Sequence, residues 1–208
     1  MNSLEKVKKY GIRAALRYIC ERVFRTQIVK AHYLRLVIDI DKVNELLKNF
    51  NLPVVELTYE DFKKGNPNVF KGAKMELYKE RCQDETYKAY GIFDGEKLVY
   101  STWISYHRLG MSYGKQKINL NANEGYLEDS YCDPIARGRG FHGAMNNYRI
   151  KKIFESGRDT VIVIVQDGNI PALKVQAKSG LKEVGCFYHG YIFGKQFNTL
   201  KKNKMDRK

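Results

Sequence analysis

The sequence predicts an α/β domain built on a mixed β-sheet, and three observations support this prediction. The second half of the chain alternates expected strands and helices, with one parallel crossover between residues 125–132 and 161–165. Residues 161–165 read Val-Ile-Val-Ile-Val, as expected of a strand buried on both faces beside a parallel neighbour. In the first half, Asp94-Gly95 lies between aromatic and β-branched arms, which predicts a β-hairpin.

The elements expected up to the hairpin follow from alternation, capping residues and turn residues. Pro53 precedes one strand, and Gly65-Asn66-Pro67-Asn68 separates two helical segments. In chain order we expect a strand at 33–40, a short helix capped by Asp41 and ending near 48, a strand at 54–57, helices near 59–64 and 71–82, and hairpin arms at 86–93 and 97–107.

Beyond the hairpin, a loop rich in Gly and Asn covers residues 109–123. A strand at 125–132 is ended by Asp133-Pro134 and leads through glycines into a helix. Ser179-Gly180 ends a second helix, as C-terminal glycines commonly do. The remaining elements are a helix at 141–156, the strand at 161–165, a helix at 170–178, and strands at 183–188 and 191–197.

The positive charge is concentrated at the two ends of the chain. Thirty-seven Lys and Arg against 23 Asp and Glu give a formal charge of +14 over 208 residues. Residues 1–30 contribute +6 and residues 195–208 contribute +5, which leaves +3 for the middle. Because the excess is terminal and no recognised nucleic-acid motif is present, we expect no nucleic-acid partner.

Lys6, Lys9, Arg13 and Arg17 share one face of a helix at 100° per residue. Such a basic amphipathic helix can lie on an anionic membrane surface. The favoured alternative is that it packs on the domain or on a second subunit, as in an oligomer, with its basic face solvated. We therefore expect an N-terminal extension at 1–50, the main domain at 51–200, and a solvated basic tail at 201–208.

Composition excludes several classes of protein. No run approaches the roughly 18 apolar residues that a membrane-spanning helix needs, and no secretory signal pattern is evident at the amino terminus. The four cysteines lie far apart without a CxxC pair, which argues against a zinc site or a disulfide framework, and we expect no metal. We expect a cytoplasmic protein, with a peripheral position at the inner membrane surface as the variant.

Residues 127–145 are the segment most informative about chemistry. An expected strand leads into a turn with Gly138 and Gly140, and the following helix contains Gly143. Backbone N–H groups at such a helix N-terminus bind anions and suit a pyrophosphate. Arg137 and Arg139 add fixed positive charge and hydrogen-bond donors. A plain tight turn would explain two of the three glycines.

This segment resembles the acetyl-CoA-binding motif of the GNAT (Gcn5-related) N-acetyltransferases. Arg137, Gly140 and His142 occupy the positions of its Arg/Gln-x-x-Gly-x-Gly/Ala signature, with His142 in place of the usual small residue. A second block is similar to the family's Asn-x-x-Ala…Tyr-x-Lys-x-Gly-Phe stretch; its matches are Asn169, Ala172, Lys178 and Gly180. The resemblance covers roughly residues 53–195.

The resemblance implies a mostly antiparallel sheet with a splayed parallel central pair and flanking helices. It implies acetyl-CoA as cosubstrate and direct transfer of the acyl group to a small primary amine, such as an amino sugar or amino acid derivative. The residues it implies for cosubstrate binding are Tyr131, Cys132, Arg137, Gly138, Arg139, Gly140, Phe141, His142, Gly143, Asn169, Ala172, Gln176 and Lys178. We expect the His142 side chain at the surface of the turn.

Acyl transfer to an amine needs a base for the ammonium proton and an acid for the leaving thiolate. Strand alternation predicts that Glu128 and Asp129 point to opposite faces, and the family's spacing favours Glu128 as the base. The family's acid is often a Tyr, but Gln176 stands in its place. Tyr188, Tyr131 or water would then supply the proton, while Cys132 contributes its backbone.

Two interpretations stay open at this point. The aromatic hairpin residues either form a wall for the acceptor or belong to the hydrophobic face of the sheet; they are Tyr87, Tyr90, Phe93, Tyr100, Trp103 and Tyr106. The substitutions Gln176 and His142 also fit a non-catalytic acyl-CoA sensor or scaffold with the same fold.

Overall fold

The computed structural model describes residues 11–12, 16, 20–21, 24–109 and 118–203. The basic face expected at Lys6, Lys9, Arg13 and Arg17 lies outside these residues, as does most of the expected tail at 201–208. Among the helices that are described, none is both long and apolar enough to cross a membrane.

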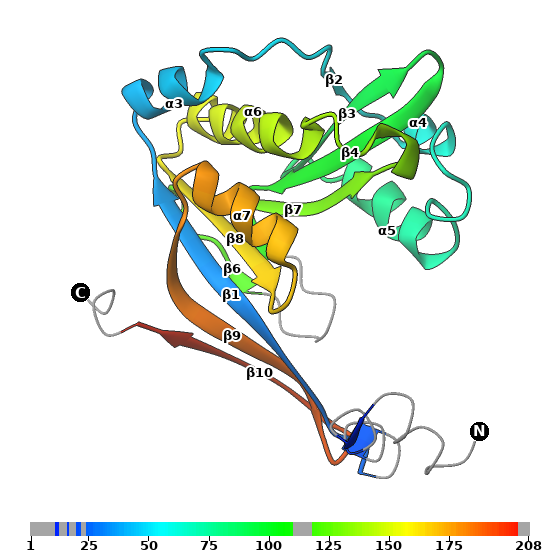
Figure 1. Ribbon diagram of the computed structural model, residues 1–208, viewed down its shortest axis with the longest axis vertical. Coiled ribbons are helices and arrows are strands. Elements are labelled where there is room, and N and C mark those ends of the chain that lie inside the picture. Colours follow the sequence, from blue (N-terminus) through cyan, green and yellow to red (C-terminus); the bar gives the residue numbers. More distant parts are fainter. Residues whose placement is uncertain (1–10, 13–15, 17–19, 22–23, 110–117, 204–208) are drawn as a thin grey trace.

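The main feature is an eight-stranded sheet with the order β10-β9-β1-β8-β7-β4-β3-β2 (Figure 1). Of the neighbouring pairs only β7 and β8 are parallel, so the sheet is mixed and mostly antiparallel, as predicted. Its strands are β1 (Gln27–Val37), β2 (Val55–Glu56), β3 (Tyr87–Asp94), β4 (Lys97–Ser105), β7 (Glu124–Cys132), β8 (Thr160–Gln166), β9 (Lys182–Ile192) and β10 (Lys195–Lys202). The short β5 (Arg108–Leu109) and β6 (Ile118–Asn119) pair separately.

Helices cover both faces of this sheet (Figure 1). They are α3 (Ile40–Leu47), α4 (Tyr59–Lys63), α5 (Ala73–Cys82), α6 (Phe141–Glu155) and α7 (Ile170–Lys178). Under α6 and α7 the core contains Leu127, Val163 and Ile150. Under α4 and α5 it contains Phe62 and Trp103, whose rings stack with centroids 5.4 Å apart. The two clusters lie on opposite faces of the sheet, and β7 packs against both, through Leu127 on one face and Tyr131 on the other.

The amino-terminal strand β1 lies in the middle of the sheet, between β8 and β9 and antiparallel to both. Ala31, Tyr33 and Leu34 are buried there. This differs from the expectation that residues 1–50 form an extension outside the domain. The alternation in this segment predicts a strand, but it carries no information about partners that lie more than a hundred residues away. Past the helices, β1 and β9 continue as a long ribbon beside β10 (Figure 1).

Most elements lie where the sequence predicts them, with three local shifts. The last two strands span Lys182–Ile192 and Lys195–Lys202 rather than residues 183–188 and 191–197. The first strand spans Gln27–Val37 rather than residues 33–40. Asp39, not Asp41, caps the helix that follows, because its Oδ1 accepts a hydrogen bond from Lys42 N at 2.8 Å. The extended backbone of Asp39 is the conformation that a capping residue needs.

The aromatic hairpin belongs to the core. Tyr87, Tyr90, Tyr100 and Trp103 are each at most 6% exposed, so they cannot stack against an acceptor from solvent. They divide between the two faces of the sheet, with Tyr90 and Tyr100 on one side and Tyr87 and Trp103 on the other. Their alternation is the period-2 pattern of a strand that is buried on both faces.

Two glycines on β7 and α6 allow a test of the packing. A Cβ at Gly125 would lie 2.6 Å from a side-chain carbon of Ile153 on α6, whereas a Cβ at Gly143 would meet nothing within 4 Å. We expect Gly125→Ala to lower the free energy of unfolding by about 1–3 kcal/mol through overpacking. Gly143→Ala should raise it by about 0.5–1 kcal/mol, because alanine favours a helix. Chemical denaturation of both variants checks the opposite signs; equal destabilisation would contradict the packing of α6 on β7.

Candidate functional site

The parallel strands β7 and β8 separate at their carboxyl ends. They are paired from Glu124 opposite Thr160 to Leu127 opposite Val163, but β7 continues to Cys132 and β8 to Gln166 without further pairing. Figure 1 shows the two arrows diverging beyond this point. Asp133 N donates a hydrogen bond to Val99 O on β4 at 2.8 Å. Because backbone groups alternate in direction along a strand, the N–H and C=O of Cys132 face away from β4, toward the splay.

A β-bulge interrupts β7 where the splay begins. Trp103 on β4 lies opposite Glu128, but Ser101 lies opposite Tyr131, so one strand carries an extra residue. Asp129 has a positive φ of 43°, a conformation that Asp tolerates better than most residues. Successive side chains after Glu128 therefore no longer point to alternate faces of the sheet.

Glu128 and Asp129 share one face of the sheet, and the expectation that they point to opposite faces is wrong. Glu128 Oε1 lies 3.2 Å and Asp129 Oδ2 lies 3.7 Å from guanidinium nitrogens of Arg81 on α5. Asp129 Oδ2 also accepts a hydrogen bond from Tyr78 Oη at 2.6 Å. The bulge accounts for this convergence, because the extra residue on β7 and the positive φ of Asp129 break the alternation directly after Glu128.

The two carboxylates differ in their surroundings. Glu128 is 7% exposed, and burial raises the pKa of its carboxyl to about 7 although Arg81 opposes the shift. Its Oε1 is buried without a hydrogen bond in the part of the chain that is described, so the charge contact with Arg81 is its main partner. A carboxyl with a pKa near neutrality suits proton transfer.

The turn after β7 is built on a short 3₁₀ helix, Pro134–Ala136, capped by Asp133. Burial opposes ionisation of Asp133, but the hydrogen bond from Ile135 N and the ammonium of Lys97 at 3.1 Å outweigh it and lower the pKa of the carboxyl. The charged cap thus fixes the direction in which the chain leaves β7.

The turn then presents an open backbone to the N-terminus of α6. Gly138 and Gly140 have positive φ angles of 81° and 76°, and an added Cβ at either would meet nothing within 4 Å. The first intrahelical hydrogen bond of α6 runs from Ala144 N to Gly140 O at 3.2 Å. The N–H groups of Phe141, His142 and Gly143 precede it, so they are free of helical partners and point along the positive end of the helix dipole.

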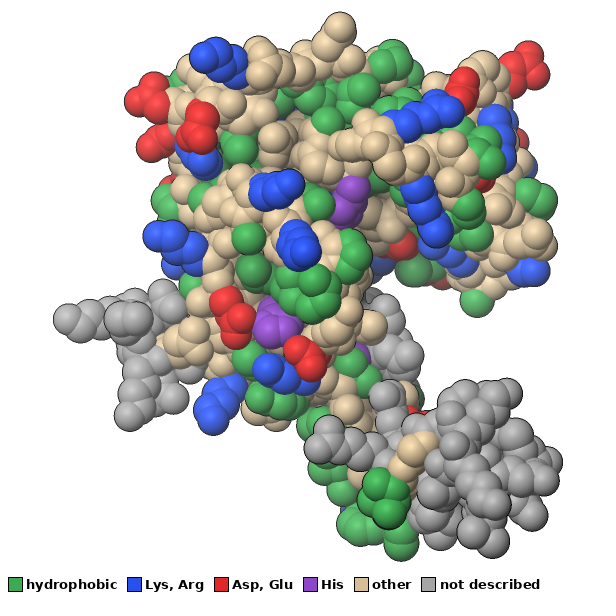
Figure 2. Space-filling model, in the orientation of Figure 1, with side chains coloured by type: hydrophobic (Ala, Val, Ile, Leu, Met, Phe, Trp, Pro, Cys, Tyr) green, Lys and Arg blue, Asp and Glu red, His purple; other side chains and the backbone are tan. Residues whose placement is uncertain are grey.

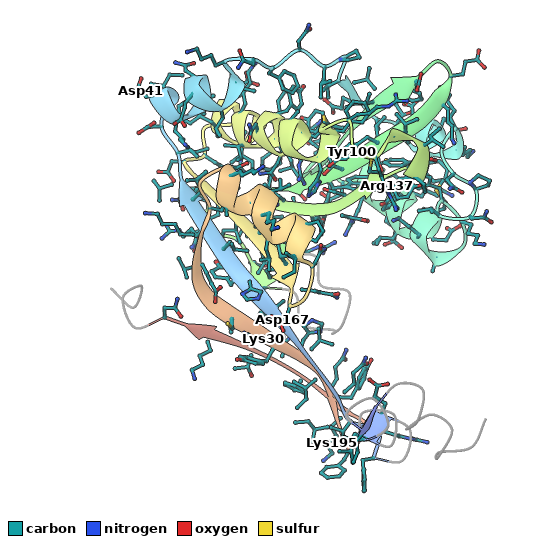
Figure 3. The ribbon with its side chains drawn as sticks, in the orientation of Figure 1. Lys30, Asp41, Tyr100, Arg137, Asp167 and Lys195 are labelled. Atoms are coloured by element: carbon teal, nitrogen blue, oxygen red, sulfur yellow. The ribbon has the colours of Figure 1, made fainter. Side chains whose placement is uncertain are left out.

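Both arginines of the turn are exposed. Arg137 Nε donates to Cys132 O at 3.5 Å, and Arg139 pairs with Asp94 of the β3–β4 turn at 3.1 Å. Figure 3 shows Arg137 beside the start of α6, close to Tyr100. Glycines with open space, free N–H groups and two arginines are the features that a pyrophosphate group requires.

The His142 side chain, which was expected at the surface of the turn, is instead partly buried beneath it. Its Nδ1 is 2.8 Å from the hydroxyl of Tyr100, which is fully buried. Burial and the nearby charge of Arg149 lower the pKa of His142 to about 4, so the ring is neutral at pH 7. The side chain therefore brings no positive charge to the turn; only its backbone N–H faces the open end of the helix.

The second block lies on α7, and the structure brings only part of it toward α6. Asn169 caps the helix by accepting from Ala172 N at 3.3 Å, and Ala172 packs on the core. Gln176 is 2% exposed and its Oε1 is buried without a hydrogen bond among the described residues. Lys178 is exposed and lies about 200° around the helix from Gln176, so it faces away.

Tyr188 is not brought together with Glu128. It lies on β9, which β1 and β8 separate from β7. It also shares a face with Cys186 and His32, which is the face of α7, while Glu128 is on the face of α5. Tyr131, the other tyrosine considered for the acid, lies on β7 itself, half-buried against Phe70 with ring centroids 5.2 Å apart.

Sequence reasoning missed Arg149, which contacts the backbone of the bulge from the α6 side of the sheet. This arginine on α6 is 1% exposed and donates to Trp103 O at 3.1 Å and Glu128 O at 3.3 Å. It also donates to Asn146 Oδ1, and Asn146 in turn donates to Ser179 Oγ on α7 at 2.8 Å. An Arg that stands between polar neighbours such as Asn147 and Lys151 looks like a surface residue, so only the tertiary structure reveals its role.

Replacing Arg149 tests this support. Arg149→Met keeps much of the side-chain volume but leaves the carbonyls of Trp103 and Glu128 without a donor. We expect the free energy of unfolding to fall by about 2–4 kcal/mol, since each buried group without a partner costs about 1–3 kcal/mol. Lys151→Met on the same helix is the control; its pair with Glu155 is half-exposed, so a loss below about 1 kcal/mol is expected. Equal losses in denaturant titrations would contradict a role for Arg149 at the bulge.

One further hollow lies away from these residues. It has a volume of about 860 Å³ and is lined by Val55, Glu56, Asp61, Lys64, Phe93, Gly95, Glu96 and Lys97. It sits at the β3–β4 turn and includes no residue of the bulge, the glycine turn or the second block. We therefore assign the candidate site to the splay.

A splayed parallel pair, a bulge beside it and a glycine turn leading into a helix define the fold of the GNAT acyltransferases. Solved structures agree. The chain superposes on a protein assigned to the acetyltransferases of the GNAT family from Novosphingobium aromaticivorans with a TM-score of 0.53 and 12% identity, over 78% of this chain and 63% of that one. The resemblance predicted from the sequence is thus confirmed at the level of the fold.

A second structure covers more of the chain. A conserved protein of unknown function from Staphylococcus epidermidis superposes with a TM-score of 0.54 and 12% identity, over 91% of this chain and 67% of that one. No family model and no curated protein matches the sequence. The chain spans less than two thirds of the length of the Novosphingobium protein. What it shares with both structures is the fold.

Proposed function

We propose that this chain is an N-acyltransferase that moves an acyl group from acetyl-coenzyme A to a primary amine of a small molecule. The observation that carries the proposal is the end of pairing between β7 and β8 after Leu127 and Val163, directly before a glycine turn at the N-terminus of α6. An extended amide chain can pair with the free edge of β7 by β-augmentation while an anion binds at the turn.

The residues that would hold coenzyme A fall into three groups. Gly138, Gly140 and the N–H groups of Phe141, His142 and Gly143 would bind the pyrophosphate, with Arg137 and Arg139 supplying charge. The backbone of Cys132 would pair with the pantetheine amides, whereas the backbone of Tyr131 faces Ser101 on β4 and is left out of this role. On α7, Asn169, Ala172 and Gln176 would line the other side, and Gln176 brings a buried oxygen with no partner among the described atoms. We leave Lys178 out, because it faces away.

Glu128 is the proposed base. Its raised pKa, its buried Oε1 and its position at the bulge all support a role in taking the proton from the ammonium of the acceptor. Asp129 is held by Tyr78 and Lys74, so its oxygens are already engaged. Asp129 would then position Arg81 and keep a second negative charge nearby, which favours proton uptake by Glu128.

For the acid we favour Tyr131 over Tyr188. Tyr131 shares the face of Glu128, and burial raises the pKa of its hydroxyl, which keeps the proton available. Its Oη lies 3.5 Å from Asp133 Oδ2. Gln176 has no acidic proton and would act only as a hydrogen-bond partner. Coenzyme A thiolate is a good leaving group, so the acid contributes modestly.

Turnover of acetyl-coenzyme A with a panel of small amines tests the proposal. The panel should contain amino sugars, amino acids and their derivatives, and the readout is the acetylated amine by mass spectrometry, because the four cysteines of the chain react with thiol reagents. Formation of an N-acetyl product that depends on the protein supports the proposal. Tight binding of coenzyme A with no product across the panel would instead favour an acyl-CoA sensor or scaffold of the same fold.

A further inference from the structure

Outside the splay, four side chains meet on the face of the sheet that α7 covers. His32 on β1 places Nδ1 2.8 Å from Glu183 Oε2 and Nε2 2.9 Å from Asp167 Oδ1. Cys186 Sγ lies 3.4 Å from Glu183 Oε1. Figure 2 shows a histidine between acidic side chains on this surface, and Figure 3 shows Asp167 beside Lys30, where β1 passes the end of β8.

A second β-bulge creates this cluster. On β9, Cys186 lies opposite His32, but the register then shifts: Gly185 lies opposite Tyr33 and Glu183 lies opposite Leu34. Residues three apart on a regular strand point to opposite faces. The extra residue, Val184, turns Glu183 back to the face of Cys186, and so both side chains reach the His32 ring. Bulges that redirect side chains are common beside functional sites.

The convergent atoms form a ligand set for a transition metal. A nitrogen of His32, a carboxylate oxygen of Glu183 and Cys186 Sγ all lie within 4.8 Å of one another. Imidazole, carboxylate and thiolate are the ligands of Zn²⁺, which binds three protein groups and a water in open sites. The carboxylate of Asp167 on the other ring nitrogen matches the outer partner that metal-bound histidines usually have.

The charges around the cluster also balance. With His32 neutral, the ionised groups Asp167, Glu183 and the Cys186 thiolate bring three negative charges. A Zn²⁺ ion together with Lys30, which lies close to Glu183 and Cys186, brings three positive charges. Side chains around the site are 15% exposed at His32 and 42% at Glu183, so an ion can enter from solvent.

We propose that His32 Nδ1, a carboxylate oxygen of Glu183 and Cys186 Sγ bind one Zn²⁺ ion, with Asp167 on His32 Nε2 and water as the fourth ligand. Binding displaces the Cys186 thiol proton and leaves His32 with one proton, on Nε2. Because the ligands come from β1 and β9, the ion fastens the inserted amino-terminal strand to its neighbour. The site is separate from the splay, so it does not depend on acyl transfer.

The competing explanation is an ion pair without metal. In that case His32 stays protonated between Glu183 and Asp167; burial opposes this, but the two carboxylates outweigh it and raise the pKa of the ring. Zn²⁺ binding has to displace this proton, so the two explanations exclude each other at Nδ1. The two explanations make different predictions: an ion pair binds no metal, and it does not require Cys186.

Titration of the full chain, free of tags and stripped with a chelator, tests the proposal. Co²⁺ is the spectroscopic probe for the Zn²⁺ site. We expect one Co²⁺ per chain, with a thiolate-to-Co²⁺ charge-transfer band that one equivalent of Zn²⁺ removes. Zn²⁺ should also raise the Tm of the protein, because it binds the folded state. Mg²⁺, which prefers oxygen ligands, should have neither effect.

Variants assign the ligands. Cys186→Ser should lose the charge-transfer band, and Asp167→Asn should weaken Zn²⁺ binding by about 10- to 100-fold as an outer partner. Cys82→Ser, on α5 and exposed, is the matched control and should behave as the unchanged chain. Circular dichroism verifies that each variant is folded. Absence of stoichiometric binding, or equal binding by Cys186→Ser and Cys82→Ser, would overturn the proposal in favour of the ion pair.

Discussion

Combining Arg137→Ala with Gly140→Asp should abolish binding of coenzyme A. The first change removes a charged donor beside the turn, and the second places a carboxylate at the N-terminus of α6, where the pyrophosphate is proposed to bind. Charge-assisted hydrogen bonds are worth about 1.5–3 kcal/mol each. Losing one such hydrogen bond and adding a repulsive charge should therefore raise the Kd for coenzyme A by at least about 100-fold, as measured by isothermal titration calorimetry.

The same helix provides a matched control. Gly157 follows the carboxyl end of α6 with a φ of 81° and open space around an added Cβ, so Gly157→Asp imposes a strain similar to that at Gly140, where φ is 76°. Paired with Arg158→Ala, it makes the same changes at the opposite end of the helix. The control should bind coenzyme A normally. If both double variants bind as the unchanged chain does, the turn is not the pyrophosphate site.

Replacing Glu128 with Gln should lower kcat by about 10²- to 10⁴-fold, the usual contribution of a general base. The variant keeps the shape of the side chain but cannot accept the proton of the ammonium. In the unchanged chain, the ionised fraction of Glu128 rises with pH through its pKa of about 7. We therefore expect kcat/KM to fall below pH 7 and to level off above it, and Glu128→Gln should remove this dependence.

Stability provides a second readout of the same group. Burial raises the pKa of folded Glu128 above its ordinary value of 4.5, so the folded state holds more protons than the unfolded state between these values. The free energy of unfolding should therefore fall as pH rises from about 4.5 to about 7, and less so in Glu128→Gln. Asp129→Asn is the neighbouring control. Wild-type kcat in Glu128→Gln, or loss of the pH dependence only in Asp129→Asn, would refute the assignment to Glu128.

The sequence predicted most elements because their signals are local. The apolar run at 161–165, the Asp94-Gly95 turn and the glycine turn before α6 each depend on neighbours within a few residues. The turn residues of the site were accordingly found where expected. His142 was the exception, because its ring turns inward to Tyr100, which is distant in sequence.

What the sequence could not predict depends on register and on tertiary contacts. A bulge leaves no composition signal, so alternation placed Glu128 and Asp129 on opposite faces when both meet Arg81. Gln176 was judged from a family position, and Tyr188 was only one of several candidate acids. The long pairing of β9 with β1 keeps Tyr188 away from β7. Arg149 was missed because a buried arginine is recognised only by the carbonyls that it serves.

The insertion of β1 between β8 and β9 also constrains biosynthesis. His32 contacts residues 135 and 151 positions further along the chain, so the ribosome releases β1 long before either neighbour exists. Until then the nascent segment has no sheet to join, and its backbone hydrogen-bonding groups are open to other chains. Such non-local pairing slows folding. β1 can complete its hydrogen bonds only after the last third of the chain, with β8 and β9, has been translated. Protection by chaperones against aggregation should therefore matter most before β9 is made.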